Sequence, residues 1–209
     1  MIQSIADFCP EGTEAGVGLA LQDDQERYLF CLAGRGLCCP PGQRCYAGIG
    51  GHREPGENWL ACAHREALEE VGADVELLSV SETWHIPKSG SPQQVDVSDR
   101  PLPLALYEMI HPAGTPRAGE AYRIVVYQAR LCGMPLHLQE DEVLAMIALT
   151  REQVIRGLET KPTLAELLAG GARIVARAAP IDGQIRVYPL GTACALAHVL
   201  RKVRLSSSR

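Results

Sequence analysis

The sequence predicts an α/β protein in which a mixed β-sheet lies between helices, an α/β/α sandwich. Two observations carry this prediction. Short apolar runs with alternating patterns recur along the chain, several of them in hairpin order, as is typical of strands. The hydrophobic period changes to that of a helix at several places, most clearly after Asn58. Strands mixed with a few helices in this way pack as layers around a sheet.

The N-terminal part is predicted to form a hairpin followed by a loop. Apolar runs at 16–21 and 27–33 flank a polar turn at 22–25, which is typical of a β-hairpin. A segment rich in glycine, proline and cysteine follows over 34–44, and a short strand is expected over 45–49.

A helix is predicted between Asn58 and Val71. Asn58 is a good N-cap, and Gly72 favours a left-handed end. Advancing about 100 degrees per residue places Glu66, Glu69 and Glu70 on one face. The residues expected on the packed side are Leu60, Ala67, Leu68 and Val71, with His64 beside them as a core histidine. Small residues expected beside the acids, leaving room for something to approach them, are Cys62 and Ala63.

The rest of the chain alternates strands and short helices. Strand-like patterns occur at 73–80, 102–110, 121–131, 142–149 and 172–179. Helical patterns begin at Arg151, which Thr150 caps, and cover 164–169 and 191–203. The polar segment 87–101 is long for a loop, which indicates a binding role or mobility.

The composition narrows the class of partner. With a formal net charge of -5, the chain has no electrostatic reason to bind a nucleic acid. An acidic protein can still bind an acidic substrate when a divalent cation reverses the local charge. No segment approaches the roughly 18 apolar residues of a transmembrane helix, and no secretory signal is visible. We therefore expect a cytoplasmic protein with no membrane partner.

The eight cysteines fit a reducing compartment better than a disulfide scaffold. Three of them, Cys38, Cys39 and Cys45, lie together in CCPPGQRC. Zinc sites use paired ligands at a short repeated spacing, which this group lacks. We expect structural thiols in a loop, and the role of the cluster stays open.

The carboxylates on the predicted helix have two interpretations. Acids three and four residues apart are common on solvated helix faces, although each like-charge pair costs roughly 0.2–0.5 kcal/mol. Alternatively, the oxygens gather Mg²⁺ or Mn²⁺, which orients a water and lowers its pKa. The spacing alone leaves both interpretations open.

The wider string GHREPGENWLACAHREALEEVGA resembles the signature of the Nudix hydrolase family. Its fixed positions are filled by Gly51, Glu57, Arg65, Glu66, Ala67, Glu69, Glu70, Gly72 and Ala73. One departure lies just outside the string, because Ile49 stands where many members have proline. The resemblance implies a Nudix-like α/β/α sandwich with a mixed β-sheet. It also implies a pyrophosphohydrolase that acts on acid anhydrides.

The resemblance also implies roles for the matching residues. The expected ligands of Mg²⁺ or Mn²⁺ are Glu66, Glu69, Glu70 and the backbone carbonyl of Gly50. Glu57 would support them, and Arg65 would orient the acids through charge-assisted hydrogen bonds. The family places its general base variably, so Glu66, Glu140 and Glu142 are all catalytic candidates.

Substrate-binding residues are harder to predict, because selectivity in the family lies outside the motif. Arg35 and Trp84 are the leading candidates, for a phosphate and a base respectively. Further aromatic candidates are His85, Tyr107 and Tyr122, and further cationic ones are Lys88, Arg100, Arg117 and Arg123. Each competes with an ordinary role in the core or at the surface.

The implied substrate is a nucleotide-like diphosphate, such as a nucleotide-sugar, an ADP-ribose-like molecule or a nucleoside triphosphate. Residues 1–161 would form the Nudix hydrolase domain, and 162–209 a C-terminal extension packed on it or used in dimerisation. A homodimer is the family's habit.

Two alternatives remain. A non-catalytic nucleotide-sensing module would have the same fold, but such modules lose motif acids that this chain keeps. Isoprenoid diphosphate isomerisation shares the fold as well, and Cys45 keeps that alternative open.

Overall fold

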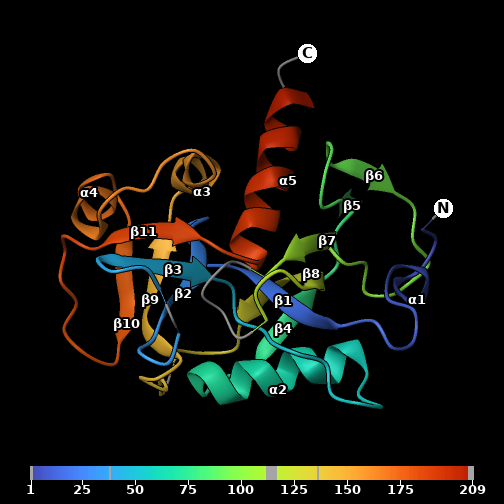
Figure 1. The fold of residues 1–209 in the computed structure, drawn as a ribbon, viewed down its shortest axis with the longest axis horizontal. Coiled ribbons are helices and arrows are strands. Elements are labelled where there is room, and N and C mark those ends of the chain that lie inside the picture. Colours follow the sequence, from blue (N-terminus) through green and yellow to red (C-terminus); the bar gives the residue numbers. More distant parts are fainter. Residues whose placement is uncertain (1, 38, 112–116, 136, 207–209) are drawn as a thin grey trace.

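The computed structural model describes residues 2–37, 39–111, 117–135 and 137–206. In these residues the chain forms an 11-stranded sheet with helices on both faces (Figure 1). The helix α2 (Trp59–Val71) lies across one face, and α5 (Thr192–Ser206) stands against the other. The predicted α/β/α sandwich with a mixed sheet is confirmed. No helix among these residues is long and apolar enough to cross a membrane.

The strands form one continuous path with three additions. The path runs β10-β9-β2-β1-β8-β7-β5-β6, while β3 pairs with β2 and β11, and β4 pairs with β8. The pairs β1/β8, β5/β7 and β3/β11 are parallel, and the other pairs are antiparallel. The strands are β1 (Ala15–Gln22), β2 (Tyr28–Ala33), β3 (Gln43–Ala47), β4 (Val75–Leu78), β5 (Thr83–Ile86), β6 (Gln93–Val95), β7 (Ala105–Ile110), β8 (Ala121–Leu131), β9 (Val143–Leu149), β10 (Arg173–Arg177) and β11 (Arg186–Pro189).

Side-chain caps fix the starts of the helices. Asn58 accepts a hydrogen bond from the Ala61 amide at the start of α2, and Gly72 ends α2 in the left-handed region. Thr150 and Thr163 each form a capping box at the next two helices. The remaining helices are α1 (Ile5–Phe8), α3 (Arg151–Gly157) and α4 (Leu164–Ala169).

The sheet separates two hydrophobic cores. Because side chains alternate along a strand, Leu19 and Leu21 of β1 enter the core shared with α2, whereas Ala20 enters the core shared with α5. Helices therefore cover both faces, and the ends of the central strands are left to carry a site.

Four short elements were not predicted from the sequence: α1, β5, β6 and β11. Each spans only three or four residues, too few to show a period. β6 lies inside the segment 87–101, which was predicted to be a loop, and exists because it pairs with β5. β11 exists because it pairs with β3, more than a hundred residues earlier.

The buried face of α2 differs from the predicted one. Leu68, expected to pack, is 54% exposed, whereas Cys62 and Ala63 are fully buried. The buried stripe also includes Ala67 and Val71, and so lies closer to Glu66 and Glu70 than predicted. The acids line the edge of the core.

His64 is also placed differently from the prediction of a core histidine. It is half-buried, and its Nδ1 bonds to the Asp74 carboxylate at the surface. The reason is that Asp74, in the segment that follows α2, offers the imidazole a polar partner at the surface.

Candidate active site

The glycine pair before α2 forms a tight loop against β1. The Leu19 amide donates to the Ile49 carbonyl at 2.8 Å, and the Val17 amide donates to the Gly51 carbonyl at 3.0 Å. Gly50 has a φ of 146°, and a Cβ there would lie 2.2 Å from the Val17 carbonyl oxygen. Only glycine fits this close approach.

Two acids of α2 pack directly against this loop. The Gly50 amide donates to Glu70 Oε1 at 3.2 Å. A Cβ on Gly51 would lie 2.5 Å from Glu66 Oε1, so the absence of a side chain there makes room for Glu66. The loop and the helix therefore form one unit.

Arg65 joins the other acids of the motif. Its Nε and Nη2 donate to the two carboxylate oxygens of Glu57 at 2.9 and 3.0 Å. Its Nη1 donates to Glu66 at 2.8 Å and to Glu69 at 3.0 Å. This fork geometry is specific to a guanidinium. Arg65 therefore holds three carboxylates of the motif together.

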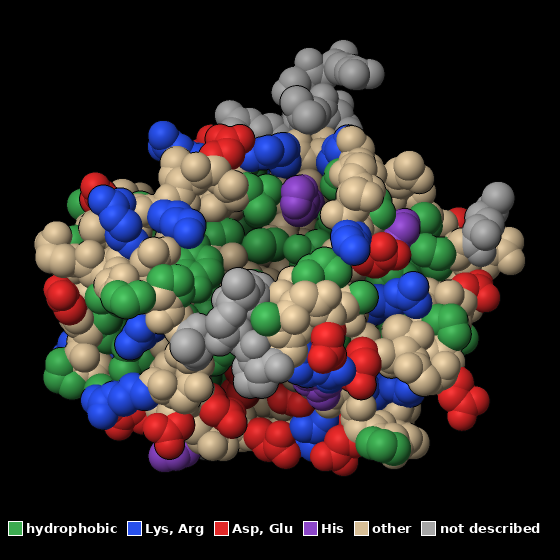
Figure 2. All heavy atoms as spheres, in the orientation of Figure 1, with side chains coloured by type: hydrophobic (Ala, Val, Ile, Leu, Met, Phe, Trp, Pro, Cys, Tyr) green, Lys and Arg blue, Asp and Glu red, His purple; other side chains and the backbone are tan. Residues whose placement is uncertain are grey.

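The pKa values of the motif acids are shifted in different directions. The hydrogen bonds from Arg65 lower the pKa of Glu57 to about 2. Burial raises the pKa of Glu70 to about 8, and the charges of Glu66 and Glu142 add to the rise while the Gly50 amide opposes it. Burial likewise raises the pKa of Glu66. Without a cation beside them, the charged forms of Glu66 and Glu70 are therefore disfavoured, whereas Glu57 is held ionised. Figure 2 shows acidic side chains gathered along the lower edge of the molecule, over α2.

A cleft with two lobes opens beside these acids. One lobe, which we call the acid lobe, has a volume of about 420 Å³ and is lined by Glu66, Glu70 and Glu142. The other, the apolar lobe, has a volume of about 400 Å³. Because the lobes share part of their walls, they form one continuous cleft. The shared residues are Leu37, Ala47, Gly48, Gly50, Gly51, His52 and Leu190.

Three rings line the apolar lobe. The Tyr122 ring centroid lies 4.7 Å from that of His52 and 5.0 Å from that of His111. The two imidazoles are parallel, with 2° between their planes. Arg117 lies beside them, with Nη1 3.0 Å from His52 Nε2 and 2.8 Å from the Glu14 carboxylate. Within the described part of the chain, the buried Nε2 of His111 has no hydrogen-bond partner.

Comparison with known families gives one match. A model described as the NUDIX domain matches residues 12–169, most of the chain. The chain belongs to the NUDIX domain family. The sequence-based identification as a Nudix pyrophosphohydrolase is thereby confirmed, and the chain is an enzyme.

Several solved structures resemble this Nudix chain. A NUDIX hydrolase from Nitrosomonas europaea is 15% identical with a TM-score of 0.45, over 68% of this chain and 75% of its own. The MutT protein from Methanosarcina mazei Go1 is 14% identical with a TM-score of 0.48, over 73% and 87%. An ADP-ribose pyrophosphatase from Streptococcus suis is 16% identical with a TM-score of 0.44, over 91% and 92%. No curated protein matches the chain.

Of the two acids predicted upstream of β9, the structure brings one to the Nudix acids. Glu142 lines the acid lobe, and its carbonyl accepts from the Gly34 amide. Glu140 forms an ion pair with Arg35 at 2.8 Å, and both side chains are well exposed. Neither Glu140 nor Arg35 is among the described residues that line the cleft, since each side chain turns toward the other.

The leading aromatic candidate also lies elsewhere. Trp84 is on β5 and packs against the core under α5, as does Tyr107 on β7. Neither belongs to the described lining of the two lobes, because β5 lies toward the far edge of the sheet. Among the further candidates, Tyr122 and Arg117 do line the apolar lobe.

Sequence reasoning missed the two histidines of the cleft. His52 and His111 lack any ligand-like spacing, and only the fold places them on either side of Tyr122. One signal was available for His52, because it directly follows the Gly50–Gly51 pair of the motif.

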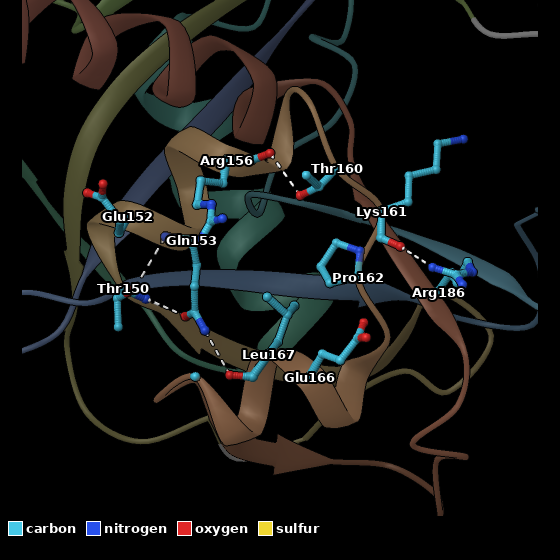
Figure 3. A pocket seen from close by; sticks show the side chains of 11 residues that line it. Thr150, Glu152, Gln153, Arg156, Thr160, Lys161, Pro162, Glu166, Leu167 and Arg186 are labelled. Carbon is cyan, nitrogen blue, oxygen red and sulfur yellow. Dashed lines mark hydrogen bonds between the residues drawn. The ribbon is translucent and has the colours of Figure 1, made fainter.

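A larger cavity of about 580 Å³ lies apart from the acids, between α3, α4 and β11 (Figure 3). Some of its polar groups bond to one another. Gln153 Nε2 donates to the Leu167 carbonyl, Arg186 Nη1 donates to the Lys161 carbonyl, and the Lys161 side chain points away. The motif acids Glu66 and Glu70 line the cleft and not this cavity.

The residues of the acid lobe suit a hard divalent cation. All its charged donors are carboxylates. Glu70 is largely buried, and among the described residues its hydrogen-bond partners are the Gly50 amide and the Cys31 thiol. A buried carboxylate without a cation is costly. As the side chains stand, no three His, Cys, Asp or Glu of the described residues form a closed metal cluster. Arg65 holds Glu66 and Glu69 in this arrangement.

Proposed function

We propose that this Nudix enzyme hydrolyses a phosphoanhydride bond in a nucleoside diphosphate linked to another moiety, with Mg²⁺ or Mn²⁺ as its cation. The observation that carries the proposal is one cleft in which Glu66, Glu70 and Glu142 line one lobe and aromatic rings line the other. A diphosphate bonded to a flat, weakly polar group fits this arrangement, with the diphosphate and its cation in the acid lobe and the flat group in the apolar lobe.

The residues proposed to hold the cation are Glu66, Glu69, Glu70 and the backbone carbonyl of Gly50. When bound, the cation would neutralise phosphate charge and lower the pKa of a bound water. The chain itself pre-positions the acids, because the Gly50 amide holds Glu70 and Arg65 holds Glu66. Glu57 anchors Arg65 from the other side through two hydrogen bonds.

For the general base we favour Glu142 or Glu66 over Glu140. A base must lie within hydrogen-bond reach of its water. Glu142 and Glu66 share the acid lobe, whereas Glu140 is paired with Arg35. Removal of the base should lower kcat. We therefore expect a lower kcat in Glu142→Gln or Glu66→Gln and an unchanged kcat in Glu140→Gln.

The apolar lobe is proposed to hold the base or another flat group of the substrate. Tyr122 and the two histidines offer ring faces for stacking, which is worth about 1–3 kcal/mol per base. In this proposal the rings of the apolar lobe, and not Trp84 and Arg35, are the main substrate contacts.

The test is a panel of nucleoside diphosphate derivatives, assayed with Mg²⁺ or Mn²⁺ and again with a chelator. We expect phosphatase-sensitive products that disappear on chelation. Glu70→Gln should lower kcat/KM by more than about 100-fold, because even the loss of a residue that only supports a metal ligand lowers activity by about 10–100-fold.

Glu76→Gln on β4 is the matched control, since Glu76 is exposed and lies outside the described lining of the cleft. It should keep full activity. Binding across the panel with no turnover would contradict the proposal and favour a nucleotide-sensing module. Turnover that survives chelation would contradict the metal requirement.

A further inference from the structure

Two of the three clustered cysteines face each other across a turn. Cys39 Sγ lies 3.8 Å from Cys45 Sγ. The chain between them reverses at Pro40-Pro41-Gly42-Gln43, where the Gln43 amide donates to the Pro40 carbonyl at 3.0 Å. Gly42 has a φ of 69°, as the third position of a type II turn requires, and Pro41 suits the second. The sequence therefore builds the contact between the thiols.

The two thiols differ in accessibility. Cys39 is half-buried, at the start of the turn, while Cys45 is buried on β3. Burial, together with the neighbouring Cys39, raises the pKa of Cys45 to about 12. A reagent in solvent therefore reaches Cys39 first, and Cys45 lies buried behind it, in position to react with an oxidised Cys39.

We propose that Cys39 and Cys45 form a site of reversible oxidation, at which a hydroperoxide converts the two thiols into an intramolecular disulfide. The Cys39 sulfur attacks the peroxide oxygen, which forms a sulfenic acid and releases one water when the oxidant is hydrogen peroxide. The Cys45 sulfur then attacks the Cys39 sulfur. The S–S bond forms, the S–O bond breaks, and the departing hydroxide takes the Cys45 proton to leave as a second water.

The geometry requires only a local adjustment. The sulfurs must approach from 3.8 Å to about 2.05 Å. Cys39 lies in the loop that joins β2 to β3, outside the sheet, while β3 is held by β2 and β11 on its two sides. Among the described cysteines, this is the pair whose thiols are in contact, although Cys132 is more exposed.

The site adjoins the catalytic cleft. Cys45 lines the acid lobe, and Leu37, two residues before Cys39, lines both lobes. The disulfide would tie the loop that carries Leu37 to the wall of the cleft. The oxidation itself requires no metal and no substrate, so it can be tested independently of hydrolysis.

The experiment treats the folded, reduced full chain with hydrogen peroxide, blocks the remaining thiols with an alkylating reagent and digests it with trypsin. Because Arg44 lies between the two cysteines, cleavage separates GLCCPPGQR from CYAGIGGHR. We expect these two peptides to be joined by a bond that a reductant breaks. The linked pair should be lost in Cys39→Ser and kept in Cys38→Ser and Cys132→Ser.

Three outcomes would overturn the proposal. One is a link that survives in Cys39→Ser, because it would then run through Cys38. Another is a Cys39 that forms no disulfide and is instead either fully alkylated or oxidised only to the irreversible sulfinic and sulfonic acids. The last is a chain oxidised in denaturant that gives the same linked pair in the same yield, because the fold would then contribute no selectivity. Cys45→Ala, with its fold checked by thermal unfolding, should also lose the link.

Discussion

The carboxylates of the Nudix motif are chemically identical, but their surroundings separate their roles. Glu57 has its pKa lowered to about 2 by two hydrogen bonds from Arg65 and stays ionised as an anchor. Glu70, largely buried beside Glu66, has its pKa raised to about 8. Burial and like charges disfavour the ionised form of Glu70, and a cation beside it would stabilise that form. The contacts of each residue therefore divide the motif into a clamp and a proposed metal site.

Gly51→Ala tests the space reserved for Glu66. The new Cβ would lie 2.5 Å from Glu66 Oε1, the movable end of a side chain, so the acid shifts while the backbone keeps its place. We expect kcat/KM to fall by about 10–100-fold, comparable to the loss of a residue that supports a metal ligand. Thermal unfolding should change little.

Gly183→Ala is the control for that substitution. A Cβ there meets only Ala165, at an ordinary 3.5 Å. If Gly51→Ala kept full activity, the close packing of the loop on Glu66 would be irrelevant to catalysis.

Arg65→Lys tests the clamp at constant charge. Lysine cannot donate two parallel hydrogen bonds to Glu57 while reaching Glu66, because its ammonium is a point charge. We expect about 10–100-fold lower kcat/KM and weaker Mn²⁺ binding in a direct titration. Arg130→Lys, at an exposed position of β8, should change neither. Equal Mn²⁺ affinity for Arg65→Lys and the unmodified chain would show that the clamp does not position the acids.

At the scale of elements, α2 is specified at its ends by local signals and in its orientation by its neighbours. Asn58 and Gly72 mark its limits, as predicted from the sequence. The helical wheel nevertheless assigned Leu68 to the packed side, although it is exposed. A wheel weighs hydrophobicity alone, whereas here the small Cys62 and Ala63 permit the close approach of β1 that brings Glu66 and Glu70 to the glycine loop.

Asn58→Ala tests how far the site depends on the start of α2. The substitution removes the acceptor for the Ala61 amide and should lower the free energy of unfolding by about 0.5–2 kcal/mol. Chemical denaturation measures this loss. Asn58→Asp keeps an acceptor beside the positive end of the helix dipole and should restore most of it. An unchanged midpoint in Asn58→Ala would mean that packing alone determines the start of α2.

At the scale of the molecule, residues 162–206 of the C-terminal extension are part of the sandwich. β10 pairs with β9 and β11 pairs with β3, so two strands of this segment lie in the common sheet. The start of α5 reaches the cleft, since Leu190, Gly191 and Thr192 line the apolar lobe. We propose that this extension belongs to the catalytic unit; its use in dimerisation stays a prediction.

Leu196→Ala tests the contribution of α5 to the fold. Leu196 is 2% exposed, in the core between α5 and the sheet, so the cavity should cost about 2–5 kcal/mol. Leu68→Ala, the same substitution at a 54% exposed position of α2, should cost far less. Denaturant unfolding compares the two. Equal losses would mean that α5 is not an integral part of the cooperative fold.

By itself the sequence determined the family, the helix that carries the acids, its caps and the main strands. These features depend on residues close together in the chain, and the motif keeps fixed offsets along one loop and one helix. Only the tertiary structure decided which other groups meet those acids. It brought Glu142, His52, Tyr122 and His111 to one cleft and left Trp84 in the core and Arg35 paired with Glu140. The physical reason is that strand pairing and side-chain direction depend on partners far away in the chain, which no local pattern specifies.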